Sequence, residues 1–479
     1  MSFSMFWEDI TVMGCLYWLY CIIAIVVMVR VVLNNRDTFK TLAWMLVLIF
    51  LPFIGLVLYF FFGRDTRRKK IIGGRMLNQI QQRGQFYDAD ENAGDIPDDY
   101  TSLVRFFENS ASASPATVES VEVISSTRSF ADALFDEIKS AKEHVHVQFY
   151  IFEDDEFGRS LRDVLVEKAR QGVEVRVIYD SVGCWNVKKE FFESMRCEGV
   201  YVEAFLKVRF PLFTNKVNYR NHRKVVVIDG RVGFIGGCNI ADRYLNGCPW
   251  GRWRDTMLRI KGNAVHGLQA SFLVDWYFAN RTLVSGKRYF PQLQSCGESL
   301  VQVVQSNPVG DVRTIMTGMI KALSTARNYV YLQTPYFMPD ESFIRALKAA
   351  AFSGVDVRLM IPERSDSRVT DYAARSYLPG LLMAGVKIYL YKEGMLHCKT
   401  FVCDDALSAV GSVNLDSRSF YYNFEVSAFV YGRSVASTLK SDFLDDVNEC
   451  RVLTMGEINE RSFKQRCLES FSRLFSPLL

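Results

Sequence analysis

The sequence predicts an α/β protein of two homologous halves that share one site at their interface, preceded by a membrane-spanning helical hairpin. Two apolar runs near the N-terminus are each long enough to cross a bilayer. Segments of the remaining chain recur at a spacing of roughly 180 residues, which is too long for a solenoid and indicates a duplicated domain. Within each copy, strand-like and helix-like segments alternate, as they do in layered α/β folds.

Composition sets limits on the class of protein. The 479 residues exceed one ordinary domain, and 49% of them are hydrophobic, which suffices for large cores. The formal net charge is only +4, so overall charge does not point to a nucleic-acid partner. The 11 cysteines are scattered and form no CxxC pair, which fits neither a zinc site nor a disulfide framework. We interpret them as reduced core residues of a cytosol-facing domain.

The two apolar runs cover residues 10–33, where Arg30 is the only charge, and residues 42–62, which carry no charge. A cleavable signal peptide needs a basic start, and no Lys or Arg precedes Arg30. The short link between the runs predicts a hairpin of two spans. Basic residues are more numerous outside the hairpin than in its link, which places the C-terminal part in the cytoplasm. The link and its edge carry Arg30, Arg36 and Lys40, and the exit carries Arg64, Arg67, Arg68, Lys69 and Lys70.

We expect four segments: the hairpin (1–70), a linker (71–118) and two homologous domains (119–295 and 296–479). Residues 82–118 are polar, acidic and turn-rich, which is typical of a linker or a loosely packed collar. The duplication is visible in residues 141–150 against 326–335 and in residues 172–177 against 354–359. The first domain is expected to contain strands at 145–151 and 173–179 and a helix at 157–170, and the second domain strands at 330–332 and 355–361 and a helix at 343–351.

One motif occurs once in each domain, with the pattern H-x-K-x4-D-x6-G-[GS]-x-N. Two of the chain's 5 histidines occupy it, so repetition at identical spacing makes the signal specific. The first copy consists of His222, Lys224, Asp229, Gly237 and Asn239, and the second of His397, Lys399, Asp404, Ser412 and Asn414.

The motif spacing suggests how the residues meet. Residues 225–228 and 401–403 are strand-like, and residues i and i+2 of a strand share a face, so each histidine points the same way as its lysine. If Asp229 and Gly230 form a two-residue turn, Gly237 lies opposite His222, and Ser412 likewise lies opposite His397. A small residue there would leave room for a phosphate beside the imidazole.

Two histidines and two lysines at one interface suit phosphodiester chemistry, which needs a nucleophile, a proton donor and fixed positive charge. A nucleophilic histidine also needs an acceptor for its second nitrogen. We expect Asp255 to orient His222 and Glu425 to orient His397, because each acid precedes a strand-like run in the same domain. The alternative is that both are ordinary exposed acids at strand starts.

These motifs resemble the signature of the phospholipase D superfamily, from Ala116 almost to the C-terminus. With the N-terminal hairpin, the chain is similar to the bacterial cardiolipin synthase family within it. The similarity lies in residues 219–224, 334–337, 411–418 and 475–479, and in Pro52, Gly55, Tyr59 and Gly63. The resemblance implies two tandem phospholipase D-like α/β/α sandwich domains in a multi-pass protein of the bacterial inner membrane.

The resemblance also implies a ping-pong transfer without nucleotide, metal or other cofactor. His222 would attack the phosphorus of one phosphatidylglycerol, and His397 would protonate the departing glycerol and then activate a second phosphatidylglycerol. Lys224, Lys399, Asn239 and Asn414 would hold phosphoryl oxygens beside the small residues Gly237 and Ser412. The motif aspartates, Asp229 and Asp404, would support the site structurally.

Two further stretches suggest lipid contact. Residues 204–228 are basic and aromatic without an acid, which suits an anionic bilayer, single-stranded nucleic acid or a core strand with a solvated face. Near the C-terminus, an apolar helical face fits either the protein or lipid; it comprises Phe463, Cys467, Phe471, Leu474, Phe475 and Leu478. Three other readings of function stay open: transfer to water or serine, a membrane-tethered nuclease, and a non-enzymatic lipid-binding protein.

Overall fold

The computed structural model describes residues 3–34, 38–51, 53–59, 96, 98–207, 218–293, 297, 299–308, 310 and 312–477. The chain divides into two compact units. The first comprises residues 1–78 and 209–215, and the second comprises residues 79–208 and 216–479.

In its described residues, the first unit contains three helices, α1 (Phe3–Asn34), α2 (Thr38–Phe50) and α3 (Ile54–Leu58). The Tyr20 hydroxyl of α1 donates to the Leu48 carbonyl of α2 at 3.0 Å, so the two helices pack against each other. The first predicted apolar run lies within α1. The second is not one continuous helix, because Phe53 adopts a left-handed φ of 64° between α2 and α3. In the described part of the chain, no helix combines the length and apolarity that a membrane crossing requires. The basic residues used to predict orientation, apart from Arg30 and Lys40, lie outside the described residues.

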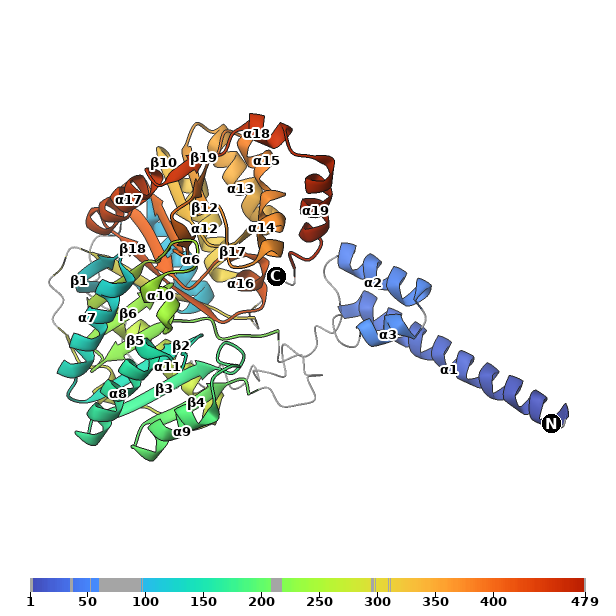
Figure 1. The fold of residues 1–479 in the computed structure, drawn as a ribbon, viewed down its shortest axis with the longest axis horizontal. Helices are drawn as coiled ribbons and strands as arrows, with labels where there is room; N and C mark the ends of the chain where they lie inside the picture. Colours follow the sequence, from blue (N-terminus) through green and yellow to red (C-terminus); the bar gives the residue numbers. More distant parts are fainter. Residues whose placement is uncertain are drawn as a thin grey trace. The chain divides into compact units, whose positions relative to one another are not determined.

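The second unit is built on one 15-stranded sheet (Figure 1). The first half contributes seven neighbouring strands in the order β1-β8-β6-β5-β2-β3-β4, and the second half repeats this order as β9-β18-β16-β15-β10-β12-β13, with β19 added at the edge. The two halves join where β1 and β9 pair antiparallel. The repeated order confirms the duplication. In the first half the strands are β1 (Ala116–Ile124), β2 (His144–Phe149), β3 (Glu174–Asp180), β4 (Tyr201–Phe205), β5 (Val225–Ile228), β6 (Val232–Gly236) and β8 (Met257–Gly262).

The second-half strands and the helices complete the layers. The strands are β9 (Leu300–Ser306), β10 (Tyr329–Gln333), β12 (Asp356–Pro362), β13 (Lys387–Tyr391), β15 (Thr400–Cys403), β16 (Leu407–Gly411), β18 (Glu425–Tyr431) and β19 (Cys450–Val452). The helices are α7 (Thr127–Ser140), α8 (Glu156–Arg170), α9 (Lys189–Cys197), α10 (Asp242–Asn246), α11 (Val265–Asn280), α12 (Thr314–Thr325), α13 (Glu341–Phe352), α14 (Arg368–Arg375), α15 (Leu378–Leu382), α16 (Ser417–Tyr421), α17 (Arg433–Val447), α18 (Met455–Asn459) and α19 (Phe463–Arg473).

The apolar side chains form a core for each half and a third core that both halves share. One face of the sheet packs against α7, α8 and α9 in the first half and against α12 and α13 in the second. The other face forms one continuous cluster from both halves, covered by α11 and α17. The predicted strand and helix ranges agree with β2, β3, β10, β12, α8 and α13 to within a few residues. The alternation of strand-like and helix-like segments along the chain was sufficient to locate them.

The predicted loose linker is wrong for residues 98–111. This segment forms a short 3-10 turn (Asp98–Tyr100) and helix α6 (Thr101–Ala111), which packs into the second-half core. Phe107 is fully buried with its ring 4.5 Å from that of Phe429, and the Gln302 amide donates to the Val104 carbonyl. The prediction failed because the acidic residues before this segment outweighed its short apolar helical face, which comprises Leu103, Val104 and Phe107. Residues 71–95 of the predicted linker lie outside the described residues.

The turn after each motif strand is one residue longer than predicted. Ile228 pairs with Val232, and Cys403 pairs with Leu407, so three residues form each turn. The first of these, Asp229 or Asp404, has a left-handed φ of 53° or 52°. Each carboxylate accepts three backbone N–H groups of the turn leading into the neighbouring strand: Lys142, Glu143 and His144 for Asp229, and Arg327, Asn328 and Tyr329 for Asp404. The motif aspartates therefore fasten the strand end remote from the histidines.

Candidate active site

Each motif histidine is held by the opposite half of the molecule. Strand β14 (Gly394–Leu396), just before His397, pairs in parallel with β7 (Arg252–Arg254), just before Asp255. The corresponding segments of the other motif, at Asn221 and Phe424, form a parallel bridge. As a result, the His397 N–H donates to the Arg254 carbonyl at 2.7 Å and the His222 N–H donates to the Phe424 carbonyl at 3.0 Å.

His222 is oriented by Glu425. Its Nδ1 lies 3.1 Å from both Glu425 carboxylate oxygens and 3.0 Å from the Ser412 carbonyl oxygen. The Ser412 hydroxyl donates to the same carboxylate at 2.5 Å, and the Asn423 amide donates to it at 3.1 Å. Glu425 itself is fully buried. With Nδ1 donating, the Nε2 atom of His222 carries the lone pair.

His397 is oriented by Asp255. Its Nδ1 lies 2.6 Å from Asp255 Oδ2, and the other carboxylate oxygen accepts the Thr256 N–H at 2.8 Å. The predicted pairing of Asp255 with His222 and of Glu425 with His397 is therefore wrong. Both acids do contact a motif histidine, but each contacts that of the other half, because the segments that precede histidine and acid pair across the interface.

The small motif residues also have different neighbours from those predicted. Continuing the observed register places Arg223 opposite Gly237 and Cys398 opposite Ser412, so neither small residue faces the histidine of its own motif. At Gly237, a Cβ would lie 2.1 Å from Asp255 Oδ1. The glycine therefore makes room for the carboxylate that orients His397, whereas Ser412 donates to the carboxylate that orients His222.

The two motif lysines are buried side chains that belong to one electrostatic cluster. The Nζ of Lys224 donates to the His222 carbonyl at 2.7 Å, and the Nζ of Lys399 donates to the His397 carbonyl at 2.6 Å. Burial lowers the pKa of Lys224 well below its usual value, and the charge of Lys399 lowers it further. Burial also lowers the pKa of Lys399, against the opposing effect of Asp255. A bound anion would relieve this cost of burying two cations close together.

The histidines are held in their neutral form. Burial lowers the pKa of His222 to about 4, although Glu425 acts in the opposite direction. Burial and the adjacent Lys399 lower the pKa of His397 to about 3. The charge of the lysine of the other half also lowers the pKa of each histidine, so all four side chains lie in one site. Burial would raise the pKa of Glu425, but His222 and Lys224 outweigh it and keep the carboxylate ionised.

A buried network that the sequence analysis missed supports this arrangement. Asp275 of α11 accepts hydrogen bonds from Asn221, Arg223 and Gln148, at 2.6–2.8 Å. Arg223 also donates to the Glu425 carbonyl at 3.1 Å, so it ties the His222 segment to the opposite half. The second half repeats the device with Asp446 of α17, which accepts from Gln333 and Arg254. The recurrence of Gln148 and Gln333 at the same place in the repeat was the available sequence signal.

Aromatic rings flank both imidazoles. The ring of Tyr150 lies 5.1 Å from that of His222, and the ring of Trp253 lies 5.1 Å from that of His397. Among the described atoms, Nε1 of Trp253 and Oδ1 of Asn414 are buried without a hydrogen-bond partner. The Asn239 side chain instead accepts the Ile151 N–H and donates to the Tyr244 hydroxyl. The two motif asparagines are thus unequal, and Asn414 has the free acceptor.

The basic stretch expected to contact lipid is only partly described, since residues 208–217 lie outside the described residues. Arg220 and Arg223 at its end are buried and paired with Asp180 and Asp275, so the expectation is wrong for these two. Arg220 and Arg223 are buried because they flank His222, where the chain runs into the site. No set of three or more His, Cys, Asp or Glu side chains in the described residues is arranged to hold a metal ion.

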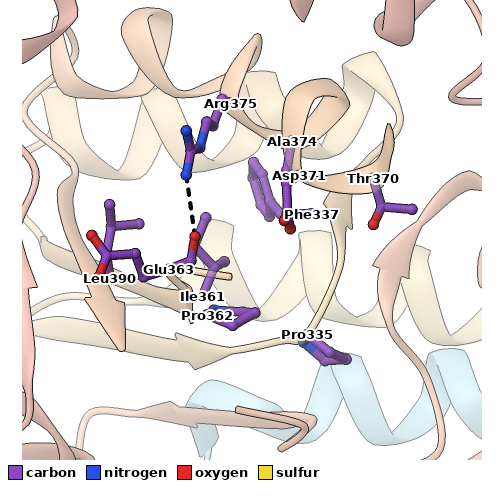
Figure 2. Close-up of a pocket in the computed structure, with 10 residues that line it drawn as sticks. All are labelled: Pro335, Phe337, Ile361, Pro362, Glu363, Thr370, Asp371, Ala374, Arg375 and Leu390. Carbon is purple, nitrogen blue, oxygen red and sulfur yellow. Dashed lines mark hydrogen bonds between the residues drawn. The ribbon is translucent and has the colours of Figure 1, made fainter. Parts of the chain in front are cut away.

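A pocket lies at the carboxyl ends of β10, β12 and β13 (Figure 2). Strand β15 begins at the same edge of the sheet, beside Lys399. One side is formed by α14, where the Arg375 guanidinium donates to the Glu363 carbonyl at 3.2 Å. Its lining residues are Pro335, Phe337, Ile361, Pro362, Glu363, Thr370, Asp371, Ala374, Arg375 and Leu390. None of the motif residues lines this pocket.

Comparisons with known proteins agree with this geometry. A family model described as "Cardiolipin synthase, PLD-like domain" matches residues 134–276 and 319–447, and one described as "Phospholipase_D-nuclease N-terminal" matches residues 21–64. The major cardiolipin synthase of Bacillus subtilis is 39% identical over 96% of this chain and 97% of its own length. A cardiolipin synthase of Listeria monocytogenes is 39% identical over 98% of this chain and all of its own length. The solved phosphatidylserine synthase of Haemophilus influenzae shares the fold, with a TM-score of 0.61 at 14% identity over 78% of this chain and 99% of that one.

Proposed function

Because the chain belongs to the cardiolipin synthase family of phospholipase D-like enzymes, we propose that it transfers a phosphatidyl group from one phosphatidylglycerol to another. The products are cardiolipin and glycerol. One observation carries the proposal: two neutral histidines, each oriented by a buried carboxylate, flank two buried lysines. This is a site preorganised for a phosphodiester anion.

In the first step, Nε2 of His222 attacks the phosphorus and forms a phosphohistidine. The bond from phosphorus to the glycerol oxygen breaks, and that oxygen takes a proton from His397. The negative charge of the phosphodiester raises the pKa of His397 from its low value in the free enzyme, which lets it act as the acid. Lys224 and Lys399 stabilise the charge that develops on the phosphoryl oxygens.

In the second step, a hydroxyl of another phosphatidylglycerol gives its proton to the now neutral His397. The hydroxyl oxygen attacks the phosphohistidine, the bond from phosphorus to His222 Nε2 breaks, and cardiolipin leaves. The buried acceptor of Asn414 and the Trp253 N–H have no hydrogen-bond partner among the described atoms, so both are available to contact substrate. Asp255 and Glu425 position the histidines throughout, and Asp229 and Asp404 hold the strands. Residues 119–295 and 296–479 act as two domains of one catalytic unit.

We further propose that the N-terminal helices anchor the chain in the bacterial inner membrane, with the catalytic unit on the cytoplasmic side. Large apolar side chains are exposed along both helices, including Trp18, Ile22 and Val29 of α1 and Leu46 and Ile49 of α2. A helix that is apolar on most sides needs an apolar environment. The full chain should therefore remain with membranes after carbonate extraction, and release into the supernatant would contradict the anchor.

The direct test incubates the purified full chain with labelled phosphatidylglycerol in mixed micelles without nucleotide. Cardiolipin and glycerol in equal amounts are expected. Phosphatidic acid as the main product would make water the acceptor and refute the transfer. The absence of any turnover of phosphatidylglycerol would refute the proposed donor.

A further inference from the structure

The C-terminal helix α19 is amphipathic in the opposite sense to an ordinary surface helix. Its buried residues include Glu469 and Ser472, whereas Phe471 is 61% exposed and Leu474, directly after the helix, is 72% exposed. Phe463, Leu468 and Phe475 are exposed as well. An apolar face normally turns toward the protein, so this helix presents to the outside the side that would usually be hidden.

Specific contacts hold α19 in this orientation. The buried Glu469 is paired with Arg461, and it also accepts a hydrogen bond from Gln465 at 3.0 Å. The guanidinium of Arg473 lies 4.6 Å from the centre of the Tyr377 ring, next to α14. The helix packs against α14. The apolar face is therefore outward because the polar face is bound, and not because the helix is detached.

The exposed charged residues of α19 are all positive. Lys464, Arg466 and Arg473 are exposed, and the only acid of the helix, Glu469, is buried and neutralised by Arg461. Basic residues beside exposed Phe and Leu are the composition of a helix that lies in the plane of an anionic bilayer surface.

The helix also lies at the catalytic edge of the sheet. Helix α14 follows the carboxyl end of β12, and part of it lines the pocket at that edge (Figure 2). The motif residues His397 and Lys399 lie at the same edge, because β15 begins there opposite the end of β10. Figure 1 shows α19 beside α14 within this half. A surface that bound α19 would thus face the edge of the sheet where chemistry occurs.

We propose that α19 is an interfacial docking helix, which inserts Phe463, Phe471 and Leu474 into an anionic phospholipid surface while Lys464 and Arg466 bind its headgroups. Docking sets the catalytic unit edge-on to the lipid that contains its substrate. This rests on the proposed function only in that both require a phospholipid surface. It is a contact separate from the N-terminal helices.

The experiment measures hydrogen–deuterium exchange of residues 463–475 in the full chain. The chain is placed in a lipid-free amphipol, in nanodiscs of phosphatidylcholine, and in nanodiscs that also contain phosphatidylglycerol. We expect exchange to be about tenfold slower with phosphatidylglycerol than in amphipol, and less slowed with phosphatidylcholine alone. Equal exchange in amphipol and in the anionic nanodiscs would overturn the proposal. Protection in amphipol that grows with protein concentration would also overturn it, because a second copy would then cover the face.

Variants separate this contact from damage to the fold. The double substitution Phe471→Glu and Leu474→Glu should remove the lipid-dependent protection. The matched control is Phe352→Glu, since Phe352 is 74% exposed at the end of α13, which leads into the amino end of β12 and so lies away from the catalytic edge. It should keep the protection, and β5 and β15 should exchange at wild-type rates in both proteins. Full protection in the double variant would refute the docking role. Exchange is read without turnover, so failure of the transfer assay alone would refute the proposed reaction and leave the docking helix intact.

Discussion

The two motif sites have the same residue pattern but different surroundings. His222 has three acceptor oxygens around Nδ1, two from Glu425 and one from Ser412, whereas His397 has one close carboxylate oxygen, from Asp255. Lys399 lies 3.0 Å from the His397 ring, while Lys224 lies over the Tyr150 ring, 5.6 Å from its centre. The duplicated motif therefore provides two similar imidazoles, and the interface makes them unequal. The surroundings of each imidazole are therefore set by residues of the opposite half.

The largest effect is expected from the histidines. His222→Ala and His397→Ala should each reduce cardiolipin formation by at least about 10⁴-fold, because each removes either the nucleophile or the proton carrier. The measurement is product formation from labelled phosphatidylglycerol, with membrane association and thermal unfolding as controls for the fold. Substantial turnover by either variant would refute the two-histidine mechanism.

The next largest effect is expected from the two acids, each of which orients the histidine of the opposite half. Glu425→Gln and Asp255→Asn should each slow turnover by about 10²–10⁴-fold without changing the product, because the imidazole loses its orienting charge. The carboxylate of Glu425 raises the pKa of His222, so its removal should shift that pKa below its value of about 4. Titration of the five ¹⁵N-labelled histidines by NMR measures this. If the His222 pKa fell in Asp255→Asn but not in Glu425→Gln, Asp255 would be the partner of His222. That result would contradict the pairing between the two halves.

The small motif residues offer a matched pair of unequal size. Gly237→Ala places a Cβ 2.1 Å from Asp255 Oδ1, so the carboxylate must move and His397 with it. We expect a loss of about 10²-fold in kcat. Ser412→Ala removes one hydrogen bond to Glu425 and should lower kcat about tenfold. Equal effects of the two substitutions would show that the surroundings of Gly237 and Ser412 are energetically alike.

The smallest difference between the halves is expected at the motif aspartates. Asp229→Ala and Asp404→Ala each remove three charge-assisted hydrogen bonds to backbone N–H groups. Both should lower the free energy of unfolding by about 2–4 kcal/mol, and to similar extents. Thermal unfolding of the full chain checks this. Strongly unequal losses would show that one half alone governs the stability of the sheet.

Four features follow from the amino-acid sequence alone: the duplication, the positions of the two motifs, the alternation of strands and helices, and the two acids that orient the histidines. These features are local, because strand faces repeat every two residues and a motif recurs at one spacing. The sequence also identified an apolar face on the C-terminal helix. It could not tell which way this face points, because that depends on the ion pair between Glu469 and Arg461 and on the contact with α14.

Three features depend on long-range contacts: which acid orients which histidine, what the small motif residues accommodate, and where residues 98–111 pack. His222 and Glu425 are separated by 203 residues and His397 and Asp255 by 142, and no local pattern encodes a contact between such distant segments. The parallel pairing across the interface brings each pair together, and one extra residue in each turn changes which side chains are opposite. Helix α6 is buried because Phe107 meets Phe429 from the far end of the chain. Contacts of this kind arise when two faces pack, and they follow from shape and register rather than from the residues next to them in sequence.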